Sequence, residues 1–119
     1  MQGDAARLRP PARRALRSPG IHLVAALQVL AEDRALVVRH EERAWASITF
    51  SGARHSLMLR FVGDIAVAAG ERFIAALSEH EFAIPRRLVA DAAIVAVRHA
   101  LLPEPSIEVE CEVLLLDED

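Results

Sequence analysis

The chain has 119 residues, of which 53% are apolar, and its formal net charge is −3. This length and apolar content suit one compact domain with a single hydrophobic core. The longest uninterrupted apolar run, Ala92 to Val97, is far shorter than the roughly 20 residues that cross a bilayer, so a membrane-spanning helix is excluded.

Two features of the composition indicate where the chain comes from and where it works. All of its basic residues are arginines, with no lysine, which is typical of a GC-rich bacterial genome. The single cysteine, Cys111, cannot form an internal disulfide, and no secretory leader opens the chain. We therefore expect a cytoplasmic protein.

Residues 1–18 combine a Pro-Pro pair with five arginines and predict a mobile basic arm ahead of a single domain at 19–119. Nucleic-acid binding would depend on these arginines, because phosphate contacts need clustered positive charge. The remainder of the chain carries nine arginines against sixteen acidic residues and offers few aromatic side chains for base stacking. Nucleic-acid binding is therefore disfavoured, although it stays an alternative.

The first regular elements are a helix and a short strand. Ser18 and Pro19 resemble an N-cap followed by proline at the first helical position. Apolar residues then recur on one helical face, which predicts a helix from about 19 to 32. A short strand is expected at 35–39.

The stretch from 49 to 61 predicts a hairpin with a four-residue turn at 52–55. In this register apolar residues lie opposite one another on the inner side, in the pairs Phe50–Leu57, Ile48–Leu59 and Ala46–Phe61. Arg54 and His55 then lie at a solvated tip, and truncating either should be nearly neutral. Phe50→Ala should instead cost about 3 to 5 kcal/mol.

A second helix is expected after Gly63, with Asp64 as its N-cap and a narrow apolar stripe that covers the sheet. Gly70 lies in the middle of this helix, where glycine costs about 1 kcal/mol relative to alanine. We interpret it as a mark of close packing.

Residues 86–102 fit either a helix or a strand. Four β-branched residues favour a strand, and the alternating stretch 106–116 requires a partner. Pairing Ala96 with Ile107 and Ile94 with Val109 makes both inner faces apolar. The sequence therefore predicts a two-layer α+β sandwich. Its antiparallel sheet has four to five strands from two hairpins, with two helices on one face, in the order α-(β)-ββ-α-ββ.

The sequence offers few residues with catalytic potential. His40 and His55, together with Glu42, are weak candidates for acid–base chemistry. The histidines lack the spacing of a zinc site, and no glycine-rich loop follows a strand, so neither a metal nor another cofactor is expected. Cys111, on the inner face of its strand, predicts a buried and unreactive thiol.

The outer side of the expected sheet is unusually apolar. In the registers above it includes five residues that we predict to form an interface, namely Trp45, Met58, Val95, Val97 and Leu114. Monomeric proteins seldom expose a large contiguous apolar patch. We therefore expect a non-enzymatic interaction module that self-associates, as a homodimer or larger oligomer, or binds another protein. The alternative is a small enzyme or ligand-binding protein that uses its His and Glu residues.

Overall fold

The computed structural model describes residues 19–118 and has an α+β fold, as the sequence predicts. Helix α2 (Pro19–Leu30) precedes a hairpin of strands β1 (Leu36–Ala46) and β2 (Ser51–Val62). Helix α3 (Asp64–Ala76) follows and continues into a short 3-10 turn (Leu77–Glu79). The chain ends in a second hairpin, of strands β3 (Arg87–Ala100) and β4 (Ser106–Asp117). The expected arm at 1–18 lies outside the described residues. Residues 87–100 form a strand, which decides the choice between strand and helix.

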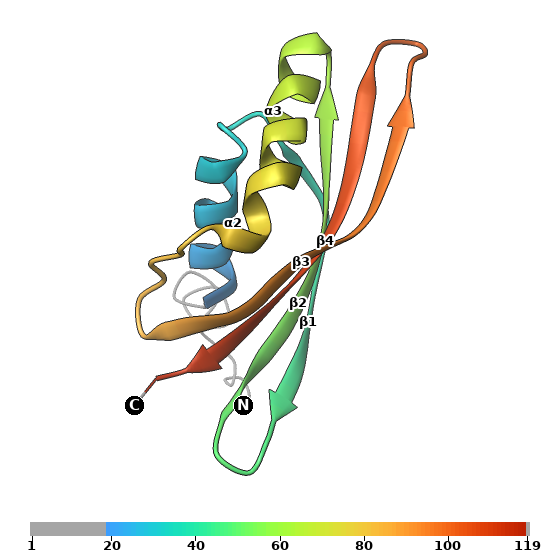
Figure 1. Ribbon diagram of the computed structural model, residues 1–119. Helices are drawn as coiled ribbons and strands as arrows, with labels where there is room; N and C mark the ends of the chain where they lie inside the picture. The colour runs from blue at the N-terminus through green and yellow to red at the C-terminus, as the bar shows by residue number, and fades with distance from the viewer. Residues whose placement is uncertain (1–18, 119) are drawn as a thin grey trace, which may run out of the picture.

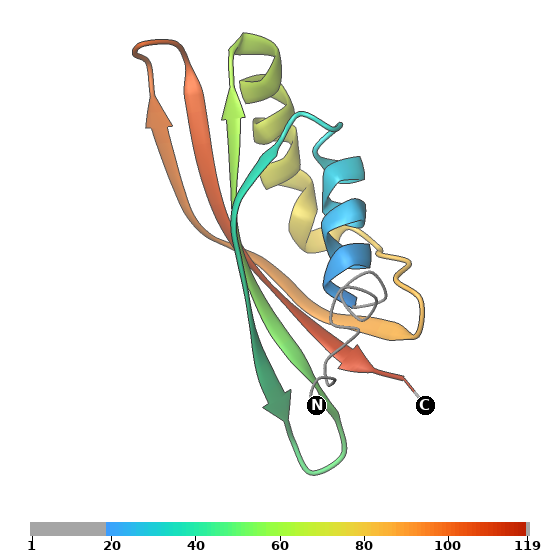
Figure 2. The ribbon, with the colours of Figure 1, turned by 180° about the vertical axis from the view of Figure 1, so that it is seen from behind.

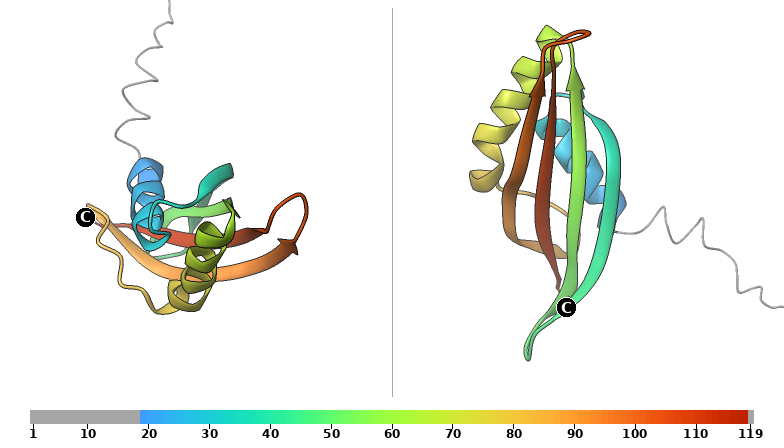
Figure 3. Two further views of the ribbon diagram at one scale, coloured as in Figure 1. Left: turned by 90° about the horizontal axis from the view of Figure 1, so that it is seen from above. Right: turned by 90° about the vertical axis from the view of Figure 1, so that its right-hand side faces the viewer.

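The four strands form one antiparallel sheet in the order β1-β2-β4-β3. Both helices lie on the same face of this sheet, and the sheet twists strongly along its length (Figures 1 and 2). The view from above in Figure 3 shows the two layers, with the helices on one side and the strands on the other. The strand expected at 35–39 is part of β1, so the sheet has four strands.

The core lies between the sheet and the helices. Every inward residue of β4 is buried, as the alternation predicts, and the inward residues of β2 and the apolar faces of both helices complete the core. Helix α3 packs closely on the sheet at Gly70, where an added Cβ would lie 2.9 Å from the ring of Phe61. This confirms the interpretation of Gly70 as a close-packing position.

The N-terminus of α3 differs in detail from the prediction. Gly63, not Asp64, is the N-cap, with a φ of 95° that favours glycine. Its backbone N–H donates to the carbonyl oxygen of Pro105 at 2.8 Å, and its own carbonyl accepts from Val67 at 2.8 Å. Gly63 therefore joins the start of α3 to the loop between β3 and β4.

The predicted register of the first hairpin was wrong. The turn spans residues 47–50, Ala46 pairs with Ser51, and Arg54 and His55 lie within β2. Ile48 and Phe50 were expected in the core, but both are exposed at the turn. The turn is closed by Ser47, whose N–H donates to the carbonyl of Phe50 at 2.7 Å while its hydroxyl accepts from the Phe50 N–H at 3.1 Å.

The predicted register of the second hairpin was also wrong. Ala100 pairs with Ser106, so the loop spans residues 101–105 and is shorter than predicted, and β3 contains two bulges. Val89 pairs with Leu115 and Ile94 with Cys111, but the register shifts between Val89 and Asp91 and again between Ile94 and Ala96. Each bulge inserts one residue and reverses the alternation beyond it. Val97 consequently shares the helix-facing side with Val109, and Ala96 turns to the outer side.

Candidate functional site

The structure brings the three candidate catalytic residues together on the helix-facing side of the first hairpin. His40 of β1 and His55 of β2 lie close enough for a hydrogen bond of 2.8 Å between His40 Nε2 and His55 Nδ1. Their ring centroids are 5.1 Å apart. Glu42 pairs with His55 across the two strands. Arg54 and His55, which were expected at a solvated tip, therefore lie within β2 and pair with strands on both sides.

His55 is fully buried, whereas His40 is half-buried. Burial lowers the pKa of His55 because it disfavours the charged ring; the proximity of His40 lowers it further, and Glu42 opposes both effects. His55 Nε2 has no hydrogen-bond partner among residues 19–118. The pair is therefore held together by one hydrogen bond between two rings, of which His55 is uncharged at neutral pH.

A cavity of about 210 Å³ adjoins this pair. Its lining includes Glu42, His55, Arg87 and Asp117, and the last two form an ion pair of 2.9 Å. A general base must reach its substrate with an unoccupied nitrogen. In His55 one nitrogen is bonded to His40 and the other is inaccessible to solvent. His55 as placed therefore offers neither ring nitrogen to a substrate.

Acidification should destabilise the fold through His55. The pKa of His55 lies below 6.5 in the folded protein, so the unfolded chain, with an ordinary histidine pKa near 6.5, binds the proton first. The free energy of unfolding then has its full value above about pH 6.5. It decreases as the pH falls toward the pKa of His55 in the folded protein, by at most about 1.4 kcal/mol per pH unit. Urea unfolding between about pH 7.5 and 5.5 measures this slope while staying above the titration of most carboxylates.

His55→Leu should remove most of this pH dependence, since leucine fills a similar volume and does not titrate. His99→Ala is the matched control, because His99 is exposed near the end of β3 and its loss should leave the slope unchanged. An equal slope in the parent and in His55→Leu would contradict the assignment.

The other candidate chemistries gain no support from the described residues. Within residues 19–118 no group of three or more His, Cys, Asp or Glu side chains is placed to hold a metal ion. Cys111 is buried, and burial raises the pKa of its thiol to about 12. No helix in the described part of the chain is long and apolar enough to span a membrane.

The middle of the outer face of the sheet is charged, in contrast to the apolar face that the sequence predicts. Salt bridges cross it from strand to strand, with N–O distances from 2.6 to 3.9 Å, and they join Arg60–Glu108, Arg98–Glu108, Arg39–Glu110 and Arg54–Glu112. Met58 lies among these pairs, between Arg39 and Glu110 in the register. This part of the face can remain in contact with water.

The second bulge of β3 changes the positions of two further residues of the predicted interface. Val97 shares the helix-facing side with Val109, and Val95 is the extra residue of the second bulge. Trp45 and Leu114 remain on the outer face, at the end of the sheet that also carries Leu88 and Leu116. The predicted residues therefore do not form one continuous apolar surface.

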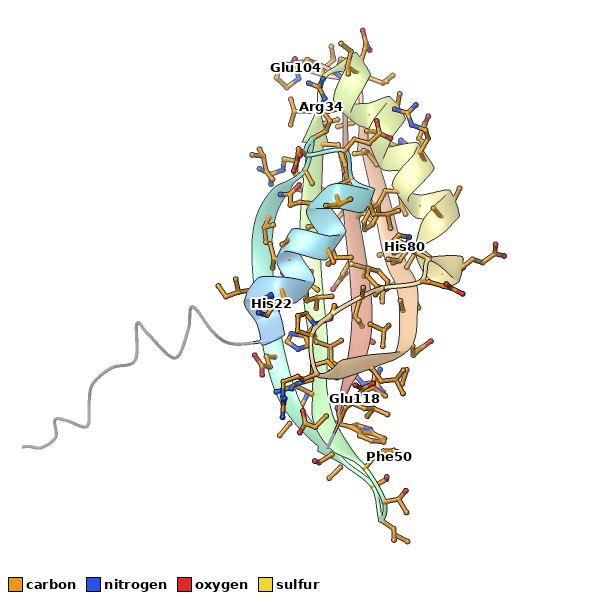
Figure 4. All side chains as sticks on the ribbon, turned by 90° about the vertical axis from the view of Figure 1, so that its left-hand side faces the viewer. His22, Arg34, Phe50, His80, Glu104 and Glu118 are labelled. Atoms are coloured by element: carbon orange, nitrogen blue, oxygen red, sulfur yellow. The ribbon has the colours of Figure 1, made fainter. Side chains whose placement is uncertain are left out.

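Large apolar side chains are instead exposed at both ends of the sheet. At the turn of the first hairpin Ile48 is fully exposed and Phe50 is 52% exposed. At the turn of the second hairpin Leu101 is 79% and Leu102 is 83% exposed. Figure 4 labels Phe50 near one end and Glu104, in the second turn, at the other. The molecule measures 51 × 35 × 20 Å, and these two apolar ends are separated along its long axis.

A hollow of about 680 Å³ lies near the Phe50 end, and we call it the loop recess. Residues 80–85 form one wall, and Arg87, Leu88, Val89 and Glu118 form the other. A second hollow of about 260 Å³ shares Leu88 and Glu118 with it and extends to Phe50. Sequence reasoning missed this recess, because its lining comes from both ends of the second hairpin.

Sequence reasoning also missed Leu101 and Leu102. The signal was available, since two adjacent leucines precede Pro103 and Pro105 in a segment that joins two strands. Prolines in such a position indicate a loop, where large apolar side chains have no core to enter. The two leucines were instead treated as the end of a strand or helix.

Comparison with known proteins adds one structural likeness. No family model matches the sequence. No curated protein matches it either. A chain of the solved structure described as "Virion of native gene transfer agent (GTA) particle" superposes with a TM-score of 0.57 at 13% sequence identity, over 84% of this chain and 92% of that chain. At this identity the likeness shows that the two chains share a fold.

Proposed function

We propose that this protein is a non-enzymatic structural subunit that works in the cytoplasm and associates with further copies of its own chain through the two apolar ends of its sheet. The observation that carries the proposal is the exposure of large apolar side chains at the two hairpin turns. Ile48 and Phe50 occupy one turn, and Leu101 and Leu102 occupy the other.

The energetics favour a contact at these turns. Burying one leucine or isoleucine side chain contributes about 1.5 to 3 kcal/mol. Within a single chain these side chains have no core to enter. The first turn projects past both helices, and the second turn stands to one side of the start of α3 (Figure 1). Contact with another chain would bury them.

The structural neighbour supports a role in assembly. Its description places it in a virion, which is built from protein subunits, and its fold covers most of this chain. The enzyme alternative would need the histidine pair to reach a substrate, and His55 is closed to solvent. The nucleic-acid alternative depends on arginines at 7, 9, 13, 14 and 17, which lie outside the described residues.

Sedimentation equilibrium at micromolar concentration tests the proposal. The parent chain should have a mass that is a multiple of the 13.0 kDa protomer. Replacing both Leu101 and Leu102 by serine, or both Ile48 and Phe50, should lower that mass. Val29→Ser is the matched control, since Val29 is an equally exposed apolar residue on helix α2, away from both turns.

Two results would overturn the proposal. One is a parent chain that is monomeric over the whole concentration range. The other is a parental mass in both double variants while their circular dichroism shows that they still fold. Either result would mean that the apolar turns do not hold copies of the chain together.

A further inference from the structure

We propose that the arginine-rich segment at residues 1–18 binds to the helix-facing side of its own sheet, in the cavity of about 210 Å³ beside His55. We call this cavity the inner hollow, and its lining consists of Glu42, Gly52, Ala53, His55, Arg87, Leu115 and Asp117. The inference goes beyond the proposed function and does not depend on it. It assigns an intramolecular contact to a segment that the sequence predicts to be mobile.

The helix-facing side of the sheet is covered only in part. Figure 4 shows α2 over the middle of the sheet, with its first turn at His22, and no described helix lies over the sheet from there toward Glu118 and Phe50. In this uncovered part Ala44 and Ala46 of β1 are exposed, although they lie on the same side of the sheet as the core residues of β2. A further segment of chain can therefore pack there.

The segment at 1–18 is joined to the chain beside this uncovered surface. It ends at Pro19, the first residue of α2, and the inward residues Gly20 and Leu23 of the first helical turns are buried. Eighteen extended residues span about 60 Å, which exceeds the 51 Å length of the molecule. The inner hollow is within reach, and tethering keeps the segment at a local concentration on the order of millimolar.

The charges of the segment and of the hollow are complementary. The segment carries arginines at 7, 9, 13, 14 and 17 against one aspartate, whereas the remainder of the chain has nine arginines against sixteen acidic residues. In the hollow, Arg87 is already paired with Asp117 at 2.9 Å. Glu42 is exposed, and within residues 19–118 the structure records no ion pair for it. A guanidinium group can therefore bind the Glu42 carboxylate.

The floor of the hollow allows a chain to lie close to the sheet. Gly52 and Ala53 present little side-chain volume, and Leu115 adds an apolar surface. The segment places leucines and alanines between its arginines, so it can contact this floor while its charged groups reach the rim. Its backbone also brings hydrogen-bonding groups to the side of His55, whose Nε2 has no partner among residues 19–118.

Paramagnetic relaxation in the full chain tests this contact. A nitroxide is attached to Ala12→Cys, while Cys111 stays unlabelled because it is buried. The amide NMR signals of Ala44 and Ala53 should lose at least about two-fold more intensity than in a comparison chain whose five N-terminal arginines are replaced by glutamine. The comparison chain carries the same label on the same tether, so it measures the effect of the tether alone.

Glu42→Gln and Glu41→Gln form a matched pair for the ion pair. Both remove a carboxylate from β1, but Glu42 lies opposite His55 on the helix-facing side and Glu41 lies opposite Ser56 on the outer side. Glu42→Gln should lower the signal loss toward that of the five-glutamine chain, and Glu41→Gln should leave it unchanged. The signal of Ala96, on the outer face, should keep its intensity in every sample.

Three results would overturn the inference. One is equal signal loss in the parent and in the five-glutamine chain, which would mean that the segment is a free tether. Another is a larger loss on the outer face than in the inner hollow. The third is an equal loss when the nitroxide-labelled chain is mixed with an isotope-labelled chain that lacks nitroxide, because the segment would then bind another copy. A monomeric parent with the expected signal loss would overturn the proposed function and support this inference.

Discussion

Replacing Gly52 by alanine should leave the chain unable to form its native sheet. Gly52 of β2 lies against the central strand β4, and a Cβ at this position would overlap the carbonyl oxygen of Leu115 and lie 2.8 Å from the Cα of Leu116. These atoms belong to the backbone of a strand paired on both sides, so they cannot move aside. We expect a loss of more than about 4 kcal/mol, seen as lost soluble yield and lost cooperative unfolding by circular dichroism.

Ser51→Ala, at the adjacent position, is the matched control. Ser51 is exposed, and its hydroxyl donates to Asp117 at 3.3 Å. Its loss should change the free energy of unfolding by no more than about 0.5 kcal/mol. A Gly52→Ala protein that unfolds at the parental temperature would contradict the close approach of β2 and β4.

Phe61→Ala should destabilise the fold by about 3 to 5 kcal/mol, as expected when a large aromatic side chain is removed from a core. Phe61 is fully buried, its ring centroid is 6.0 Å from that of Phe73, and Gly70 lies against its ring. The resulting cavity cannot collapse easily, because sheet and helix both border it. Chemical denaturation monitored by circular dichroism gives the difference.

Phe50→Ala is the comparison variant and should cost less than about 1 kcal/mol in the monomer. Phe50 lies half-exposed in the first turn and leaves no cavity when it is truncated. This reverses the expectation from sequence, which assigned the large loss to Phe50. Equal losses in the two variants would favour the register that the structure rejects.

The first hairpin could be predicted only in part from the sequence. Leu57, Leu59 and Phe61 were placed correctly on the inner face, because alternation within one strand determines which residues share a side. Their partners were misplaced, because Gly52 was interpreted as a turn residue. The glycine is needed for close backbone approach, and the actual turn is closed by the Ser47 hydroxyl.

The candidate site depended on the same register. The sequence grouped His40, Glu42 and His55 as possible partners, and the structure does bring them together. The burial of His55 could not be predicted, since a turn at 52–55 would place it in water. The burial of His55 follows only when β2 is recognised as starting at Ser51.

The predicted outer face of β3 differs from the structure for a different physical reason. Strict alternation along β3 would send Val97 outward, but two bulges reverse the pattern. A single sequence gives no clear signal for a bulge among alanines and valines. The strand itself was predictable from its β-branched residues, whereas the direction of its side chains was not.

The location of the bulges has a consequence for the two edges of the sheet. All three register shifts of the sheet, at Val38, Ala90 and Val95, fall in β1 and β3, which are its two outer strands. An unpaired strand with regular hydrogen-bonding groups is a template on which further strands can add without limit, which leads to aggregation. A bulge interrupts that template, because a straight incoming strand cannot match its donors and acceptors on both sides of the extra residue. The two edges of the sheet are thereby protected from indiscriminate strand addition.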